Sequence, residues 1–269
     1  MSLAYSAPAA PQYPWEPESG NRANLAMGEL KQLLGKRMGH ANAAATLLSA
    51  AGALVGFSAQ NAALEQGELL SQRRDLVAPK SVLLFTNAHG ERYLLGSWIN
   101  GPLLLGYGHA LPMLGFLAKA AAGAGLRAPD FPDINAIERR IAAAIKEPGF
   151  GAVEPPEGCQ LAATPRELLR VLWPKARKTL AAPMPVHLPD EPPLDDAHWP
   201  ILLSIVAARL MTQMKDVIGP KPALALVLES ALVASRLDPE LIDPGRWKLA
   251  PSRGGLQIAK AERFRRMVG

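Results

Sequence analysis

Two long stretches of the chain contain no Asp, Glu, Lys or Arg, and they constrain the fold more than any other feature. One runs over residues 41–64 and the other over residues 93–118. Long uncharged segments of this kind belong in the interior of a folded protein or in a membrane. Neither stretch carries a catalytic motif, so both bear on architecture rather than on chemistry.

The composition of the first stretch favours a buried helix over a membrane span. Its length would permit a span, since a transmembrane helix needs about 20 residues. Alanine dominates it, however, and the polar residues Asn42, Gln60 and Asn61 interrupt it. Strongly apolar residues are too sparse for good insertion into lipid. We therefore expect the core helix of a soluble protein, with no membrane partner.

Small residues recur along this stretch with the spacing of one helix face. Successive members lie four or three positions apart, which keeps them on one stripe of an α-helix. The stripe consists of Ala45, Ser49, Gly52, Gly56, Ala59 and Ala63. A stripe without large side chains lets another helix backbone approach closely. We predict a central helix with a close helix neighbour along this stripe.

A β-hairpin is predicted at about residues 82–96. An apolar run at 82–86 is followed by a turn at 87–90 and a return run at 91–95, which is a hairpin pattern. An isolated hairpin is only marginally stable in water, so it must lie on helices or pair with another strand. Edge-to-edge pairing with a second copy of the chain is one way to stabilise the hairpin.

The predicted turn also carries a cluster of polar side chains. The cluster consists of Asn87, His89, Glu91 and Arg92. Binding residues often lie on loops, so this cluster is one candidate site. Asn and Gly are also favoured simply as turn residues, so a purely structural role is the alternative.

The second uncharged stretch offers a candidate ligand pocket in its Gly-rich part, residues 100–112. Pro112 divides this region into two short buried helices, and the glycines leave space for a ligand. Asn100, Tyr107 and His109 are the residues that would line such a pocket. Alternatively, each is a core residue satisfied by one hydrogen bond.

The remaining segments are mostly helical by their periodicity and capping residues. Expected helices lie at 24–39, 133–146, 200–218 and 222–236, with a short basic helix at 258–267. Another begins at Thr164 and should end or kink at Pro174, with a further turn possible to about residue 180. The predicted fold is therefore mainly α, a helical bundle-like core of two halves with one small β-hairpin. The halves span 22–147 and 164–269, joined by a Pro- and Gly-rich linker at 148–163. Residues 1–21 form a Pro-rich tail, expected to be disordered and without a secretory signal.

Charge and cysteine content narrow the classes of function. The formal net charge is +5, and much of the excess lies in a basic C-terminal segment, residues 246–266. The single cysteine, Cys159, excludes an internal disulfide and Cys-rich zinc sites, and it fits the cytoplasm. Cys159 is either an incidental loop thiol or a nucleophile that His187 would activate.

No catalytic residue, metal site or cofactor motif is predicted. The glycines near Lys36 lack the spacing of a phosphate-binding loop, and no zinc or calcium motif occurs. We therefore expect a non-enzymatic regulatory or protein-interaction protein whose partner is a second copy or another protein. One alternative is a small-molecule-binding protein or enzyme with a pocket at residues 100–112. The other is a weak nucleic-acid binder acting through the basic C-terminal segment.

Overall fold

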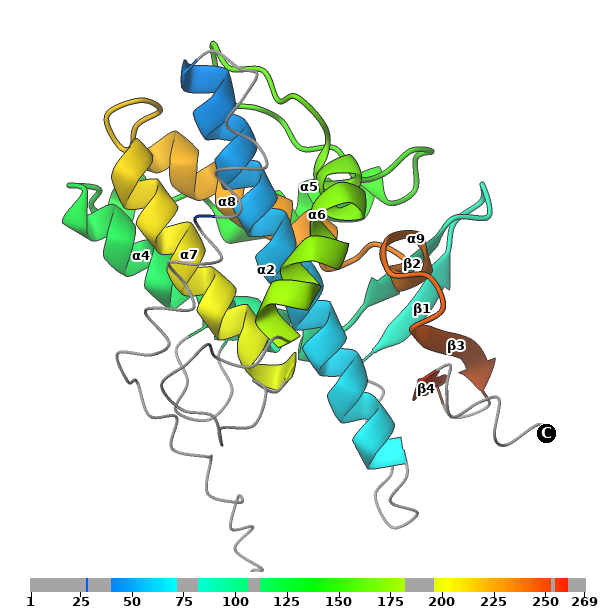
Figure 1. Cartoon of the computed structure of the whole chain (residues 1–269). Coiled ribbons are helices and arrows are strands. Elements are labelled where there is room, and N and C mark those ends of the chain that lie inside the picture. The colour runs from blue at the N-terminus through cyan, green and yellow to red at the C-terminus, as the bar shows by residue number, and fades with distance from the viewer. Residues whose placement is uncertain are drawn as a thin grey trace, which may run out of the picture.

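The computed structural model describes residues 28, 40–71, 82–105, 112–181, 196–252 and 255–260. Figure 1 shows a mainly α-helical protein with small β-hairpins at one side, which confirms the predicted fold class. The longer helices are α2 (His40–Ser71), α4 (Met113–Gly123), α5 (Ile134–Ala144), α6 (Pro165–Ala181), α7 (Trp199–Met214) and α8 (Pro220–Ala234). The short ones are α3 (Ser97–Asn100), the π-helical turn η1 (Gly101–Leu105), η2 (Ala128–Asp130), η3 (Asp196–His198) and α9 (Pro239–Ile242). The strands are β1 (Leu83–Thr86), β2 (Arg92–Leu95), β3 (Trp247–Ser252) and β4 (Gly255–Lys260).

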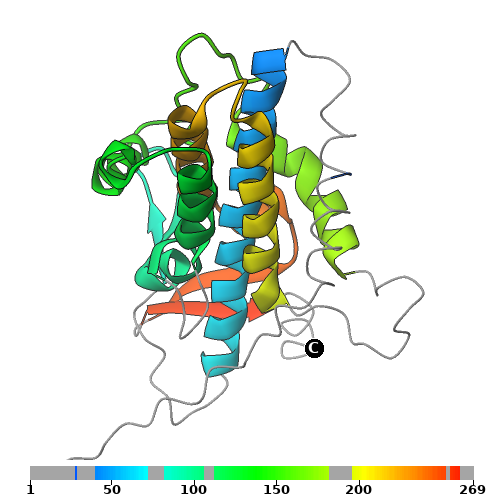
Figure 2. The same ribbon diagram turned by 90° about the vertical axis from the view of Figure 1, so that its left-hand side faces the viewer.

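Helix α2 lies at the centre and is enclosed by α6, α7 and α8 (Figures 1 and 2). Ser49 and Ser230 bring their hydroxyl oxygens to 3.0 Å across the contact between α2 and α8. Gly52 and Gly56 face the backbone of α8 at Val227 and Ala231. The small residues of α2 therefore meet a helix whose backbone lies unusually close, since no side chain separates the two axes.

Residues from both halves of the chain share one hydrophobic core. Phe57 of α2 packs edge-on against Trp173 of α6, with ring centroids 4.7 Å apart. Trp173 in turn packs against Trp199 of α7 at 5.9 Å. All three rings are buried. Aromatic rings of this size bury much apolar area, so this trio joins α2, α6 and α7 firmly.

Capping residues begin α5 and α6 where the sequence indicated. Asp133 accepts a hydrogen bond from the Ala136 amide at the start of α5. Thr164 and Glu167 form a reciprocal capping box at the start of α6. Helix α6 continues through Pro174 to Ala181. The helix expected at 24–39 lies outside the described residues except at Gly28, and so does the tail at 1–21.

A second hairpin, β3–β4, corrects the prediction at the C-terminal end. Residues 258–260 belong to β4 instead of the expected short basic helix. Strand β3 is fixed by Trp247, which is buried and donates from its indole nitrogen to Asn61 Oδ1 at 2.8 Å. Ile258 then lies opposite Leu249 in the antiparallel pair. This contact with α2 spans most of the chain, so local periodicity does not predict it.

One described helix is long and apolar enough to cross a membrane, at Ala41–Glu65. Within the structure, 83% of that apolar window is buried against other parts of the protein. The segment therefore has the surroundings of a core helix.

Candidate interaction site at the first hairpin

Among the described strands, β1 pairs only with β2, and the second hairpin, β3–β4, packs close to it. Strand β1 pairs antiparallel with β2, with Leu83 opposite Leu95 and Thr86 opposite Arg92. Strand β2 is bonded on its other side as well, because the Leu94 amide donates to the Arg236 carbonyl at 2.9 Å. Within the described ranges, no strand pairs with the outer edge of β1.

Asn87 organises the turn between the two strands. Its Oδ1 accepts hydrogen bonds from the backbone amides of His89 and Glu91, at 2.9 and 3.0 Å. Its Nδ2 donates to the Ile145 carbonyl at 3.2 Å, just after α5. The side chain of His89 is exposed. Asn87 therefore acts as a turn residue, and this part of the predicted polar cluster is structural.

Glu91 ties the hairpin to two other parts of the fold. Its carboxylate accepts from the Tyr93 hydroxyl at 2.7 Å and from the Gly149 amide at 3.2 Å. The Arg166 guanidinium lies 3.8 Å away. The hydrogen bond from Tyr93 is the main cause that lowers the pKa of Glu91. Burial, with the Glu91 bond, raises the pKa of the Tyr93 hydroxyl, and the Tyr93 ring packs edge-on against Phe150.

Arg92 points away from Glu91, toward the chain just before α9. Its guanidinium pairs with the Asp238 carboxylate at 2.7 Å. Asp238 also caps α9 by accepting from the Glu240 amide at 3.1 Å. Within the predicted polar cluster, Asn87 Nδ2 donates to Glu91 Oε2 at 3.3 Å, whereas Arg92 turns away to Asp238. Asn87, Glu91 and Arg92 each hold the hairpin in place through these contacts.

The outer edge of β1 is uncharged and partly apolar. In antiparallel pairs, backbone groups point alternately toward and away from the partner strand. The Asn87 amide bonds to the Glu91 carbonyl, so Leu84 and Thr86 direct their backbone groups outward. Leu83 and Phe85 leave 48% and 39% of their surface exposed.

Asn100, from the predicted ligand pocket, is engaged by an ion pair between buried Arg236 and half-buried Glu138. Its Nδ2 donates to Glu138 Oε1 at 3.2 Å, and its Oδ1 accepts from Arg236 at 3.4 Å. Arg236 is 9% exposed and lies 3.5 Å from Glu138, and burial lowers its pKa. Tyr107 and His109 lie outside the described residues. The amide of Asn100 therefore has a structural role between α3, α5 and the end of α8.

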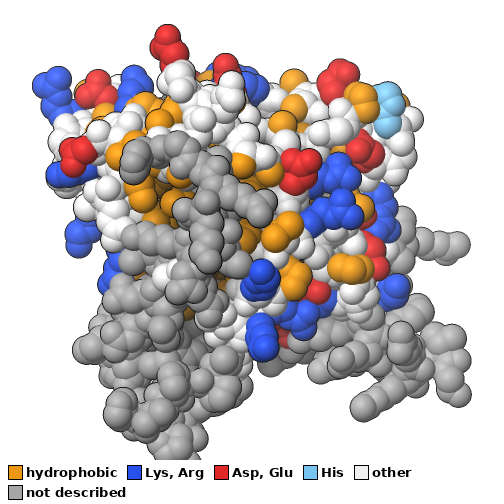
Figure 3. Space-filling model, turned by 45° about the horizontal axis from the view of Figure 1, so that its top comes forward, with side chains coloured by type: hydrophobic (Ala, Val, Ile, Leu, Met, Phe, Trp, Pro, Cys, Tyr) orange, Lys and Arg blue, Asp and Glu red, His pale blue; other side chains and the backbone are white. Residues whose placement is uncertain are grey.

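Among the described residues, the charged side chains do not group to hold a metal, and on the face in Figure 3 they do not gather into a basic patch. No group of three or more His, Cys, Asp or Glu side chains is placed to hold a metal within those described residues. Arg246, from the predicted basic segment, forms an ion pair with Asp196. On the face in Figure 3, basic and acidic side chains alternate with hydrophobic ones. Such mixed charge is typical of a solvated surface.

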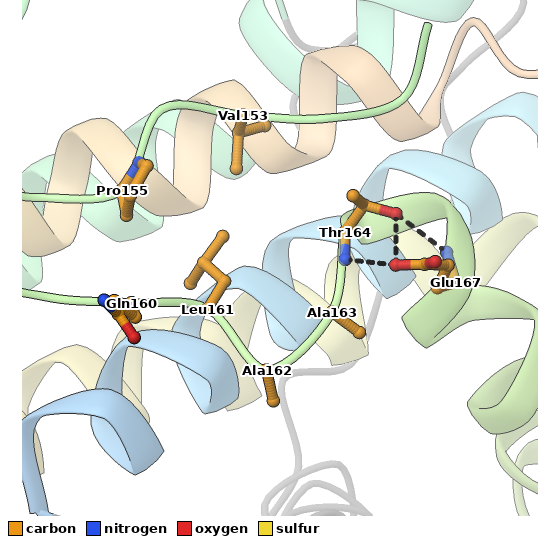
Figure 4. Close-up of a pocket in the computed structure, with 8 residues that line it drawn as sticks. All are labelled: Val153, Pro155, Gln160, Leu161, Ala162, Ala163, Thr164 and Glu167. Atoms are coloured by element: carbon orange, nitrogen blue, oxygen red, sulfur yellow. Dashed lines mark hydrogen bonds between the residues drawn. The ribbon is translucent and has the colours of Figure 1, made fainter. Parts of the chain in front are cut away.

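A hollow lies where the segment between α5 and α6 crosses the start of α2 (Figure 4). Its volume is about 470 Å³. Val153 and Leu161 point toward one another across it, and the Thr164–Glu167 capping box closes one end. The lining is Val153, Pro155, Gln160, Leu161, Ala162, Ala163, Thr164 and Glu167. The sequence indicated only a linker here, because these residue types form no recognisable motif.

Cys159 adjoins this hollow as the neighbour of Gln160. It is half-buried, and its amide donates to the Pro156 carbonyl at 2.9 Å. His187, the base considered for it, lies outside the described residues. Cys159 lies in the loop beside the hollow, so its position is useful as a probe of the hollow.

No family model matches the chain, and no curated protein or solved structure matches it either.

Proposed function

We propose that this chain is a non-enzymatic protein-interaction protein that self-associates through the outer edge of β1. The observation that carries the proposal is a strand edge without charge that no described strand pairs with. Natural proteins usually protect such edges with charged residues, proline or a bulge. Residues 83–86 read Leu-Leu-Phe-Thr and contain none of these protections. An unprotected edge is a template for pairing with another strand.

A second copy fits this edge by symmetry. A two-fold axis through Phe85 would place Leu84 of each copy opposite Thr86 of the other, so the outward backbone groups exchange hydrogen bonds. Phe85 would then face its own counterpart in a non-hydrogen-bonded pair, where Cα atoms lie about 4.5 Å apart. An aromatic cross-strand pair adds roughly 0.2–1 kcal/mol. The edge is uncharged, so two copies meet without repulsion.

The contacts of the turn support the same proposal. Asn87, Glu91 and Arg92 bond to residues after α5, at the start of α6 and before α9. These contacts hold the hairpin in one position before any partner arrives. Preorganisation lowers the entropy lost on association. The single cysteine supports the further proposal that the protein works in a reducing compartment such as the cytoplasm.

Sedimentation analysis over a range of protein concentrations tests the proposal. We expect a concentration-dependent dimer for the wild-type chain. Thr86→Pro removes an outward amide, and Phe85→Lys places like charges opposite each other, so both should shift the chain to monomer. Val217→Lys is the matched control, because Val217 is 45% exposed but lies outside the strands. A wild-type chain that stays monomeric throughout would refute self-association.

A further inference from the structure

The hollow beside α6 is fastened to the first turns of α2. Asn42 Oδ1 accepts a hydrogen bond from the Gln160 amide at 2.9 Å. Thr46 Oγ1 accepts from the Ala162 amide at 3.1 Å. Gln160 and Ala162 both line the hollow. The first turns of α2 therefore lie next to the hollow.

The segment that precedes α2 has a regular proline pattern. Prolines stand at positions 8, 11, 14 and 17, which is every third residue. A polyproline II helix has three residues per turn, so this spacing puts the four rings along one edge. Tyr13 and Trp15 lie within the same run, and the first basic residue is Arg22. Overlapping P-x-x-P repeats of this kind are typical of segments that dock in grooves.

We propose that the proline segment, residues 8–17, binds in the hollow of its own chain. The walls formed by Val153, Pro155 and Leu161 are aliphatic and suit proline rings and the Trp15 indole. The hollow, at about 470 Å³, lies within the size range of ligand sites. Proline restricts the unbound segment, so less entropy is lost when it docks.

The covalent connection makes this segment the favoured occupant. Residues 18–39 link the prolines to α2 and span at most about 75 Å when extended, far more than a return to the adjacent hollow requires. For a short flexible linker, the effective concentration of a tethered segment at its binding site is in the millimolar range. A free ligand or a second copy must compete with that concentration. The docked segment would cover apolar side chains that otherwise face solvent.

Cys159 provides the test, because it is the only cysteine and adjoins Gln160. Glu16→Cys places a second thiol beside Trp15, and Ser2→Cys places one beyond the proline run. Mild oxidation followed by non-reducing peptide mapping measures the rate of disulfide formation with Cys159 in each full-length variant. The tether to residue 40 is 24 positions long from residue 16 and 38 positions long from residue 2. This difference in length alone changes the rate of ring closure about twofold.

We expect the disulfide from Glu16→Cys to form at least about tenfold faster than that from Ser2→Cys, since docking adds to the twofold effect of tether length. Leu161→Asp should abolish the faster disulfide formation from Glu16→Cys, whereas Val217→Asp should leave it unchanged. Far-UV circular dichroism verifies the fold of both variants. Rates within about twofold would overturn the proposal. Disulfides between chains in an isotope-mixed sample would also overturn it and assign the hollow to a second copy. Thr86→Pro should not change these rates, so this test is separate from that of β1 pairing.

Discussion

Gly56 of α2 lies directly against the backbone of Ala231 in α8. A β-carbon added to Gly56 would overlap the Ala231 carbonyl oxygen and lie 2.7 Å from its carbonyl carbon. Gly52 has the same relationship one turn earlier, with Val227. The two glycines are therefore required by the short distance between the helices and not by backbone conformation. This contact also joins the two halves of the chain.

Replacing Gly56 should destabilise the protein. Gly56→Ala forces α2 and α8 apart, and Gly56→Leu does so further. Overpacking of a core costs roughly 1–3 kcal/mol, occasionally more. We expect Gly56→Ala to lower the free energy of unfolding by this amount in urea titrations, and Gly56→Leu to prevent stable folding.

The matched control is Gly123→Ala at the end of α4. A β-carbon there would meet nothing within 4 Å. Alanine is the better helix former, so this change should be neutral or stabilise by up to about 1 kcal/mol. If Gly56→Ala behaves like Gly123→Ala, the two helices separate without cost and the close contact is unimportant.

Local patterns in the sequence predicted the elements, and long-range contacts account for what they missed. The spacing of Gly52 and Gly56 predicts a stripe because helix geometry depends only on position along the chain. The identity of α8 as the neighbour does not follow, since α8 is buried nearly all round and carries no unique complementary pattern. The first hairpin was predictable because its strands are adjacent in sequence.

The candidate site shows the same limit. Asn87, Glu91 and Arg92 are neighbours in sequence and read as one polar cluster. Their partners lie far along the chain, at Ile145, Arg166 and Asp238 respectively. Alternation along a strand also sends successive side chains to opposite faces. The sequence cluster therefore stays together only in part: Asn87 still donates to Glu91, while Arg92 pairs with Asp238.

The stabilising effect of Glu91 should depend on pH. Its pKa in the folded protein lies below the ordinary value of 4.5, chiefly because Tyr93 donates to it. The unfolded chain therefore binds the proton more readily, so this contribution is complete above pH 4.5 and declines as the pH falls through the folded pKa. Glu91→Gln should lower the free energy of unfolding at neutral pH, and the gap to wild type should narrow below pH 4.5.

Glu229 should show the opposite slope and serves as the comparison. Burial raises its pKa above 4.5 despite the Arg140 ion pair at 2.7 Å. The folded protein then binds the proton more readily, so stability from this group declines as the pH rises above 4.5. Wild type and Glu229→Gln should therefore have similar stability below pH 4.5, and wild type should lose stability relative to the variant as the pH rises. Equal slopes for the two variants in urea titrations would contradict both assignments.

Asp243 should be important for the stability of α6 in the core. Its carboxylate accepts from the Trp173 indole nitrogen and from Arg177, each at 3.1 Å. Asp243→Ala leaves the buried indole N–H without this acceptor, at a cost of about 1–3 kcal/mol. Asp130→Ala is the control, because its pair with Arg127 is exposed and 3.8 Å long. That change should cost less than about 1 kcal/mol, and equal losses from both would contradict the role of Asp243.

Trp247 should determine whether the second hairpin stays on α2. Trp247→Phe keeps most of the buried ring but removes the donor to Asn61 Oδ1. Asn61 is only 1% exposed. An unpaired buried acceptor costs about 1–3 kcal/mol, and the loss falls on the contact between β3 and α2. Amide hydrogen exchange should therefore accelerate across β3 and β4 by about tenfold or more, while the centre of α2 keeps its protection. Lys248→Ala, at an exposed neighbouring position, should leave exchange unchanged. Exchange that accelerates equally in α2 would show that the hairpin unfolds only with the whole protein.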